Sequence, residues 1–421
     1  MKIKTYKCNS FNVHTIKTDK FKTTHMEIMF RCPVIKEDLA KQTFLIDMLS
    51  ETSKKYPKRK DLIIKFEELY KTSLYGSNIK TGQMLIMNFI TDFINPNFIS
   101  DKNYLEEVIK LPFELIERPN VVNEEFDLKQ FNIIKERLIK EINSISDNPF
   151  KLCMKKAFEA MDKDSPSSYS LYGTVDELKS ITPSSLYKMY KQMLKNSVCD
   201  IFIIGNLDMD EAVSLIKKHF KYRYINNIPI PLYVNNKIKK KELIISEKSD
   251  NIQANMTVIY NINNLTDNEK HIVFQVFNYI FGNGGLTSKL YQKIREENSL
   301  CYSISSMYMK YDNLLAIHVS LDNNNTKKAL TLIKKCLKEM NEGKFSEEEL
   351  NDAKMNMCMS LDFACDNNVS LLNNYVFNYF DNFPMIDERK EMYKKVTKED
   401  VVNVSKKLKL NTVFILEGKG E

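Results

Sequence analysis

Several features that would place this chain of 421 residues in a familiar class are missing from it. No apolar run reaches the roughly 18 residues that a membrane-spanning helix needs, so we expect no membrane span. The first residues, 1–21, are too polar for a secretory signal peptide. The eight cysteines are scattered and form no C-x-x-C pair, which is typical of a reducing compartment. Together these absences predict a cytoplasmic protein without structural disulfides.

Motifs of several enzyme classes are absent as well. Without a G-x-x-x-x-G-K-[ST] phosphate loop, the chain is not expected to hydrolyse nucleoside triphosphates. There is no G-x-S-x-G nucleophile elbow, and the FGNGG segment lacks the setting of a dinucleotide site. The net charge of +7 is spread along the chain, with one basic run, KIKKK, at 237–241. No nucleic-acid motif accompanies this charge, so we expect no nucleic-acid partner.

What the sequence does contain is a repeated order of landmarks. They recur at an offset of about 216 residues, too long for a solenoid repeat, so we expect two copies of one domain. We place the copies at 1–228 and 242–421, joined by a linker at 229–241 in which prolines alternate with apolar residues. The matching landmarks are Ile181 and Val396, Gly205 and Gly418, Asp147-Asn148 and Asp366-Asn367, and Glu124-Glu125 and Glu348-Glu349.

Each half mixes segments of helical spacing with segments of strand spacing and shows no regular β-α-β alternation. This pattern predicts an α+β fold, in which helices pack on one face of a mainly antiparallel sheet. Predicted helices include Leu39–Ser53, Glu124–Ser146, Pro149–Ala160 and Pro183–Lys195, the last with Thr182 as its N-cap.

The stretch from Phe281 to Ser306, FGNGGLTSKLYQKIREENSLCYSISS, is the most informative in the chain. Three of the ten glycines lie within four residues of it, which predicts a backbone bend that side chains would block: Gly282, Gly284 and Gly285. A helical pattern then follows, formed by Leu286, Leu290, Tyr291 and Ile294.

Arg295 closes this predicted helix, and Tyr302 begins a predicted strand in which Tyr302, Ile304 and Ser306 share one face. A cation at a helix end and a phenol at a strand start can both donate hydrogen bonds to one carbonyl or carboxylate. The spacing alone leaves another interpretation open, in which Arg295 pairs with Glu296 or Glu297 and Tyr302 is half-buried.

This stretch resembles the second half of the pitrilysin/insulinase-type inverted-zincin peptidases, especially the two-chain branch that includes mitochondrial processing peptidase. In that family an Arg and a Tyr hold the substrate peptide against the zinc site of the other half. The resemblance implies this substrate-binding role for Arg295 and Tyr302, and a clamshell of two LuxS/MPP-like metallohydrolase domains. The family run G-G-x-x-S-x-L-x-x-x-x-R-E-x-x-x-L-x-Y-x-x-x-S is matched by Gly284, Gly285, Ser288, Leu290, Arg295, Glu296, Leu300, Tyr302 and Ser306.

The same resemblance reveals a missing metal site. Catalytic members carry H-x-x-E-H on their first helix, where two His bind zinc, the Glu is the general base, and a downstream Glu is the third ligand. Here Thr43, Ile46 and Asp47 stand at those three positions, while Glu141 resembles the downstream ligand. None of the five histidines forms an i, i+4 pair elsewhere. We therefore expect no metal and no cofactor in this chain.

The resemblance thus implies a non-catalytic subunit of a heterodimeric zinc metallopeptidase, inactive by itself. Its partners would be a homologous H-x-x-E-H subunit, which carries the zinc, and a peptide substrate. The alternatives are a structural scaffold or a peptide-binding protein of the same fold with no role in proteolysis. The identity of the substrate, the cleavage site and the oligomeric state do not follow from the sequence.

Overall fold

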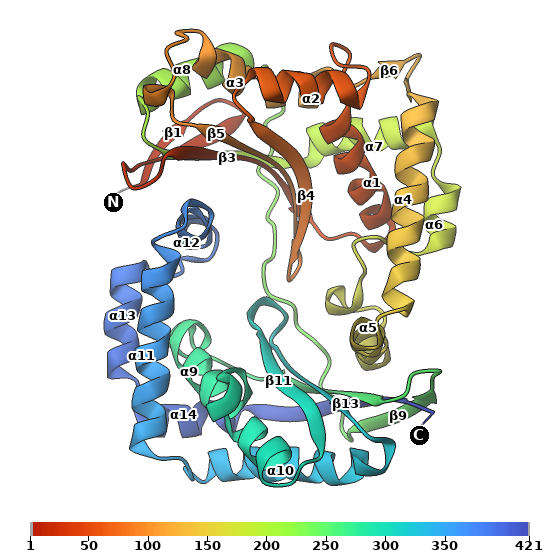
Figure 1. The fold of residues 1–421 in the computed structure, drawn as a ribbon, viewed down its shortest axis with the longest axis vertical. Coiled ribbons are helices and arrows are strands. Elements are labelled where there is room, and N and C mark those ends of the chain that lie inside the picture. The colour runs from red at the N-terminus through yellow and green to blue at the C-terminus, as the bar shows by residue number, and fades with distance from the viewer. Residues whose placement is uncertain (1–2, 420–421) are drawn as a thin grey trace. The chain divides into compact units, whose positions relative to one another are not determined.

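The structure is a computed structural model that describes residues 3–419. Its helices and strands form two compact units, each assembled from three separate segments of the chain. Figure 1 follows the chain from the red N-terminal strands to the blue C-terminal helices. Within 3–419, no helix combines the length and the apolar character needed to cross a membrane. The first unit consists of Met1–Ile142, Ser170–Leu232 and Ala364–Phe380, and the second of Asn143–Tyr169, Tyr233–Phe363 and Asp381–Glu421.

The first unit is built on a six-stranded sheet in the order β1-β2-β8-β3-β5-β4. Its neighbouring strands are antiparallel except β2 and β8, which are parallel. The strands are β1 (Ile3–Lys7), β2 (Phe11–Lys17), β3 (Thr23–Pro33), β4 (Ser73–Thr81), β5 (Met84–Ile94) and β8 (Val198–Gly205). The helices are α1 (Leu39–Glu51), α2 (Arg59–Glu68), α3 (Tyr104–Glu117), most of α4 (Leu128–Ser146), α6 (Val175–Ser180), α7 (Pro183–Asn196), α8 (Met209–His219) and α12 (Asn368–Asp381), and a short ribbon of β6 (Val121–Val122) and β7 (Glu125–Phe126) precedes α4.

The second unit is built on a five-stranded sheet in the order β11-β12-β10-β13-β9, in which only β13 and β9 are parallel. The strands are β9 (Leu243–Lys248), β10 (Ala254–Ile262), β11 (Cys301–Met309), β12 (Leu314–Leu321) and β13 (Leu408–Glu417). The α-helices are α5 (Pro149–Asp162), α9 (Phe274–Asn278), α10 (Thr326–Asn341), α11 (Glu347–Ala364), α13 (Ile386–Lys395) and α14 (Lys398–Ser405). Three π-helical segments cover Glu269–Val273, Tyr279–Asn283 and Tyr291–Glu296.

The two sheets have the same topology. The order β2-β8-β3-β5-β4 in the first unit corresponds strand for strand to β9-β13-β10-β12-β11 in the second, and each has one parallel pair at the same place. The first unit differs by the extra edge strand β1. The predicted α+β class and the predicted duplication are therefore confirmed.

Two of the four repeated landmarks lie at the starts of corresponding helices. Thr182 and Thr397 each accept a hydrogen bond from the backbone N–H three residues later, and so cap α7 and α14. Asn148 and Asn367 do the same for α5 and α12. A cap satisfies a backbone donor that would otherwise have no intrahelical partner, so the same residue types recur where the same helices begin.

Two helices belong to a different unit from the one that their place in the sequence suggests. Cys153 and Ala157 of α5 lie in one buried cluster with Ile259 of the second unit's sheet. Conversely, Tyr379 of α12 lies in the first unit, where its hydroxyl donates to the buried Asp200 at 3.4 Å. The predicted domains were contiguous halves, whereas the compact units exchange α5 and α12. Apolar periodicity identifies the buried face of a helix but not the sheet that it covers.

One face of the first unit's sheet carries buried ionisable groups. His25 is fully buried, with Nδ1 at 2.6 Å from Asp92 Oδ1 and Nε2 at 2.7 Å from Glu27 Oε1. Burial alone would lower the pKa of His25, but the hydrogen bonds to Asp92 and Glu27 outweigh it and raise the pKa to about 9. The folded protein therefore holds His25 in its charged form at neutral pH.

We expect the folded state to lose stability as the pH rises from about 6.5 to above 9, because in that interval the folded chain holds a proton on His25 that the unfolded chain releases. The raised pKa of His25 corresponds to roughly 3 kcal/mol. Urea denaturation of the wild type and of His25→Gln across this range would measure it, and the variant should show a flatter pH profile. His219→Gln, in α8, serves as the control, and an unchanged profile in His25→Gln would contradict the assignment.

Candidate functional site

The first unit contains a pocket of about 420 Å³ between α1, α4 and the edge strand β4. It brings together all four positions that the sequence assigned to the degenerate metal site: Thr43, Ile46, Asp47 and Glu141. The strand β4 passes so close to α1 that a Cβ atom on Gly76 would lie 2.8 Å from Cγ1 of Ile46. Glycine at this position therefore lets the strand form one wall of the pocket.

Two of the four positions offer nothing to a metal ion. The hydroxyl of Thr43 donates to the carbonyl of Leu171 at 2.6 Å and accepts from Nδ2 of Asn78 at 3.2 Å, so the protein already uses it as both donor and acceptor. Ile46 is buried and has no donor atom in its side chain. What remains is a pair of carboxylates, Asp47 and Glu141.

A third side chain, which sequence reasoning missed, pairs with one of these carboxylates, Asp47, and with Glu51 on the same helix. Nη2 of Arg137 donates to Oδ2 of Asp47 at 3.0 Å, and Nη1 donates to Oε1 of Glu51 at 2.5 Å. Burial raises the pKa of Asp47, and Arg137 only partly offsets that effect. Arg137 lies one helical turn before Glu141 on α4, so its i, i+4 spacing was the available signal.

The donor set does not fit zinc. A catalytic zinc site needs three protein ligands around a position that remains open to water. Here Asp47 is paired with a guanidinium, which also places a positive charge where a dication would have to enter. Within residues 3–419, no group of three or more His, Cys, Asp or Glu side chains is placed to hold a metal ion. We therefore assign no metal chemistry to this pocket.

The second candidate region, in the other unit, begins with the predicted glycine turn. A Cβ on Gly282 would lie 2.6 Å from Oγ of Ser306, so this glycine lets the turn pack directly against β11. Gly285 has a φ of +62°, a backbone conformation that favours glycine. Gly284 lies between them. The residues after these glycines form a 3₁₀ turn, Gly285–Thr287, and then a π-helix rather than the one regular helix that the spacing predicted. Leu286 is consequently exposed and not part of an inward stripe.

Arg295 lies in the last turn of the π-helix Tyr291–Glu296, with an exposed side chain. Its Nη1 donates to the hydroxyl of Tyr291, and the guanidinium lies 4.8 Å from the centre of that ring. The alternative pairing with Glu296 or Glu297 is not observed, since Glu297 pairs with Lys293 at 2.7 Å and no ion pair of Arg295 is found between described residues. Most of the guanidinium donors therefore remain available to another molecule.

Tyr302 is the extra residue of a β-bulge. In the pairing of β11 with β12, Cys301 lies opposite Leu321 and Ser303 lies opposite Ser320, so Tyr302 has no partner. A bulge shifts the alternation of side chains by one residue. The expectation that Tyr302 shares a face with Ile304 and Ser306 was therefore wrong.

The bulge decides how the tyrosine is presented. Tyr302 is 60% exposed, whereas Ile304 and Ser306 are buried. The connection back to Arg295 is short and closed by two backbone hydrogen bonds, from Ser299 N to Arg295 O at 2.9 Å and from Leu300 N to Ile294 O at 3.0 Å. Both side chains assigned to substrate binding are thus on the surface at the two ends of one tight turn.

Comparison with known proteins agrees with this picture. The family profile described as "Peptidase M16 inactive domain" matches residues 180–357. A protein of Bacillus subtilis named "Probable inactive metalloprotease YmfF" is 25% identical over 98% of this chain and 97% of its own length. Residues 180–357 thus resemble the inactive domain of peptidase M16, and the whole chain is similar to a protein named as a probable inactive metalloprotease. The residues at positions 43, 46 and 47, which are Thr, Ile and Asp in place of two zinc-binding His and a general-base Glu, agree with the inactive character that these descriptions give to the relatives.

Solved structures support the same assignment of fold. A conserved protein from Enterococcus faecalis V583 superimposes with a TM-score of 0.94 at 25% identity and covers 100% of this chain and 99% of that one. The structure of a peptidase M16 inactive domain from Pseudomonas fluorescens has a TM-score of 0.81 at 16% identity and covers 100% of this chain and 98% of that one. The M16 fold therefore extends over the whole chain.

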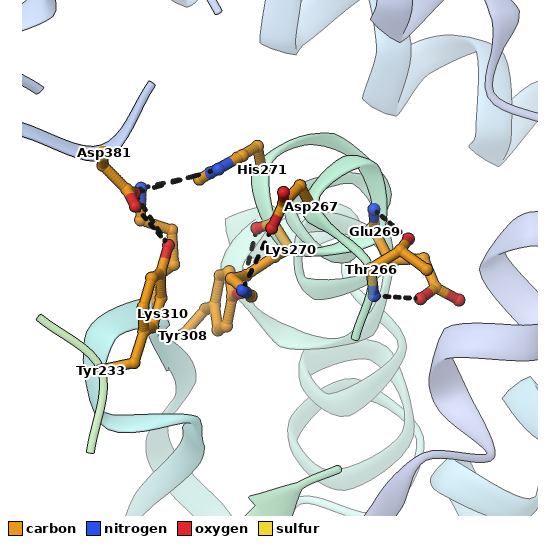
Figure 2. A network of polar contacts seen from close by, with 9 residues as sticks. All are labelled: Tyr233, Thr266, Asp267, Glu269, Lys270, His271, Tyr308, Lys310 and Asp381. Atoms are coloured by element: carbon orange, nitrogen blue, oxygen red, sulfur yellow. Dashed lines mark hydrogen bonds and ion pairs between the residues drawn. The ribbon is translucent and has the colours of Figure 1, made fainter. Parts of the chain in front are cut away.

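A further polar network in the second unit was not predicted from the sequence (Figure 2). The carboxylate of Asp381 accepts from the hydroxyl of Tyr233 at 2.8 Å and from Nζ of Lys310 at 2.9 Å. Burial lowers the pKa of Lys310 to about 8, and it lowers the pKa of the adjacent His271 to about 4.

A lysine with a lowered pKa is a candidate for chemistry. Lys310, however, is largely buried and forms an ion pair with Asp381, which also binds Tyr233. This network gives the lysine a structural reason to lie in the interior. Tyr233 and Asp381 are each the first residue of a segment of the second unit. The network therefore connects the starts of two segments that are separate in the sequence. We assign it a structural role. The sequence separation of 148 between these two residues explains why no local pattern indicated the network.

We expect the wild-type chain, purified alone, to carry no stoichiometric zinc. Thr43→His/Ile46→Glu/Asp47→His would restore the family's metal-binding residue types but retain Arg137 beside them. Adding Arg137→Val should strengthen zinc binding by about tenfold or more, because a positive charge directly beside the site, even one that is partly exposed, repels a dication. Zinc content after dialysis against graded chelator concentrations, measured by mass spectrometry, checks both statements. Equal zinc retention by the two variants would show that Arg137 does not oppose the metal.

Proposed function

We propose that this chain is the non-catalytic subunit of a heterodimeric zinc metallopeptidase. Its partner would be a homologous M16 chain that carries H-x-x-E-H and the zinc, and its substrate would be a peptide. The observation that carries the proposal is a contrast. The zinc positions have been replaced, whereas Arg295 and Tyr302 keep exposed side chains on a closed turn. A chain with only a structural role has no need of that pair.

The chemistry of the two side chains suits a peptide backbone. The guanidinium has several N–H donors in a fixed planar arrangement, and the phenol adds one O–H donor. Two such donors can hold the carbonyl oxygens of an extended peptide and stabilise the oxyanion that develops when one of them is attacked. Removal of one oxyanion donor in other enzymes costs about 10²–10³ in rate. We assign this positioning role to Arg295 and Tyr302, while the reacting groups belong to the partner.

The setting of the chain fits the same proposal. A peptide can bind through main-chain hydrogen bonds to the edge of a sheet, which requires little sequence identity in the substrate. The scattered cysteines suit assembly with the partner in a reducing compartment such as the cytoplasm.

The test is the activity of the mixed complex. We expect Arg295→Ala to lower kcat/KM by about 10²–10³ while the two chains still co-purify. Tyr302→Phe, which keeps the ring and removes the hydroxyl, should lower it less. Lys293→Ala is a matched control in the same π-helix and should leave kcat/KM unchanged. If Arg295→Ala had no effect on kcat/KM, the proposed role would be refuted.

Two other functions remain distinct in their consequences: a structural scaffold, and a peptide-binding protein with no role in proteolysis. Either would assemble into complexes that contain no H-x-x-E-H chain. Mass spectrometry of the complex purified from the native host distinguishes these cases, because the proposed function requires such a partner in equal amounts.

A further inference from the structure

Strand β11 is an unusually open edge of the second unit's sheet. It is the outermost strand next to β12, and within residues 3–419 the structure pairs it with β12 alone. Its nine residues, CYSISSMYM, include no charge, no proline and no glycine. The side chains on its uncovered face are small or flexible, with Ser303, Ser305 and Met307 exposed.

The other outer strands are protected in ways that β11 is not. Lys4 and Lys7 lie on β1, and Glu247 and Lys248 lie on β9. The strand β4, which corresponds to β11 in the first unit, carries Lys80. Charged residues on an edge discourage pairing with other chains, so proteins usually place them there. A nine-residue edge without any of these features is suited to accept another strand.

The start of β11 adds a specific anion-binding group. Arg295 lies beside the first residues of β11, because the hydrogen bond from Leu300 N to Ile294 O closes the turn between them. The charge of Arg295 accordingly opposes the rise in the pKa of Cys301 that burial causes. No carboxylate of residues 3–419 pairs with Arg295. The open strand thus has a positive group with free donors at its N-terminal end.

We propose that β11 docks an extended peptide in the antiparallel sense, with the free C-terminal carboxylate of that peptide at Arg295. The two features require each other. In an antiparallel pair the C-terminal end of the added strand lies at the N-terminal end of β11, which is where the guanidinium is. The peptide side chains along the strand would be uncharged, to match an edge without charge. The ligand is therefore a peptide with a new or natural C-terminus, and its meaning as substrate or product rests on the proposed function.

The inference is tested on the isolated full chain, without a catalytic partner. The probe is a Val/Ser octapeptide with an N-terminal fluorescein and a free carboxylate, compared with its C-terminal amide by fluorescence anisotropy. We expect the amide to bind at least tenfold more weakly, because it loses a charge-assisted hydrogen bond. Arg295→Ala should reduce binding of the acid to the level of the amide. Lys293→Ala should leave both unchanged.

Two further measurements locate the contact. Two peptides are compared, one methylated on the odd-numbered backbone nitrogens and the other on the even-numbered ones. One should lose binding and the other should keep it, because only every second N–H of an added strand faces β11. Hydrogen exchange should slow at 303–307 on peptide binding and stay unchanged at 75–79 in β4. Equal binding of acid and amide, no binding of either, protection at β4, or self-association through β11 would each overturn the inference. Because no proteolysis is measured, these outcomes are independent of the activity of the mixed complex.

Discussion

The ion pair between Arg137 and the carboxylates of Asp47 and Glu51 determines what the first unit can do. A guanidinium neutralises part of the negative charge that the pocket would otherwise concentrate, as a metal ion would, but it has no position open to water. It is always protonated, so no ordinary pH removes it. The acidic residues Asp47 and Glu141 therefore line a pocket in which a guanidinium, and not a dication, balances part of their charge.

The second unit shows the opposite outcome on the same topology. Its edge strand β11 occupies the place that β4 has in the first unit. There, a glycine turn, a π-helix and a β-bulge combine to expose two hydrogen-bond donors. π-helical turns and bulges interrupt regular pairing and are frequent at functional sites. One copy of the duplicated domain has thus closed its site with an internal cation, while the other has kept an exposed one.

Much of this was accessible from the sequence, because the signals were local. The cap residues Thr182 and Asn148 indicate where two helices begin, and the glycine cluster indicates a bend in the backbone. The four degenerate metal positions, which the family resemblance supplied, all line one pocket. Patterns that repeat within a few residues report on the few backbone hydrogen bonds that they control.

Other features depended on partners far away in the sequence. The bulge at Tyr302 is a property of the register between β11 and β12, and no residue type in the strand marks it. The packing of α5 and α12 depends on which sheet is complementary to them. Asp381 acquires its network from Tyr233 and Lys310, which no periodicity connects to it.

The exchange of α5 and α12 also limits the order in which the protein can mature during translation. The first unit requires Ala364–Phe380, so the buried Asp200 does not gain its bond from Tyr379 until almost the entire chain has left the ribosome. The strands that are synthesised first therefore stay partly uncovered until α12, near the other end of the chain, has been synthesised. For the same reason, dividing the gene between the two repeats would not give two chains that fold independently. Each chain would lack a helix, α12 or α5, that its compact unit needs.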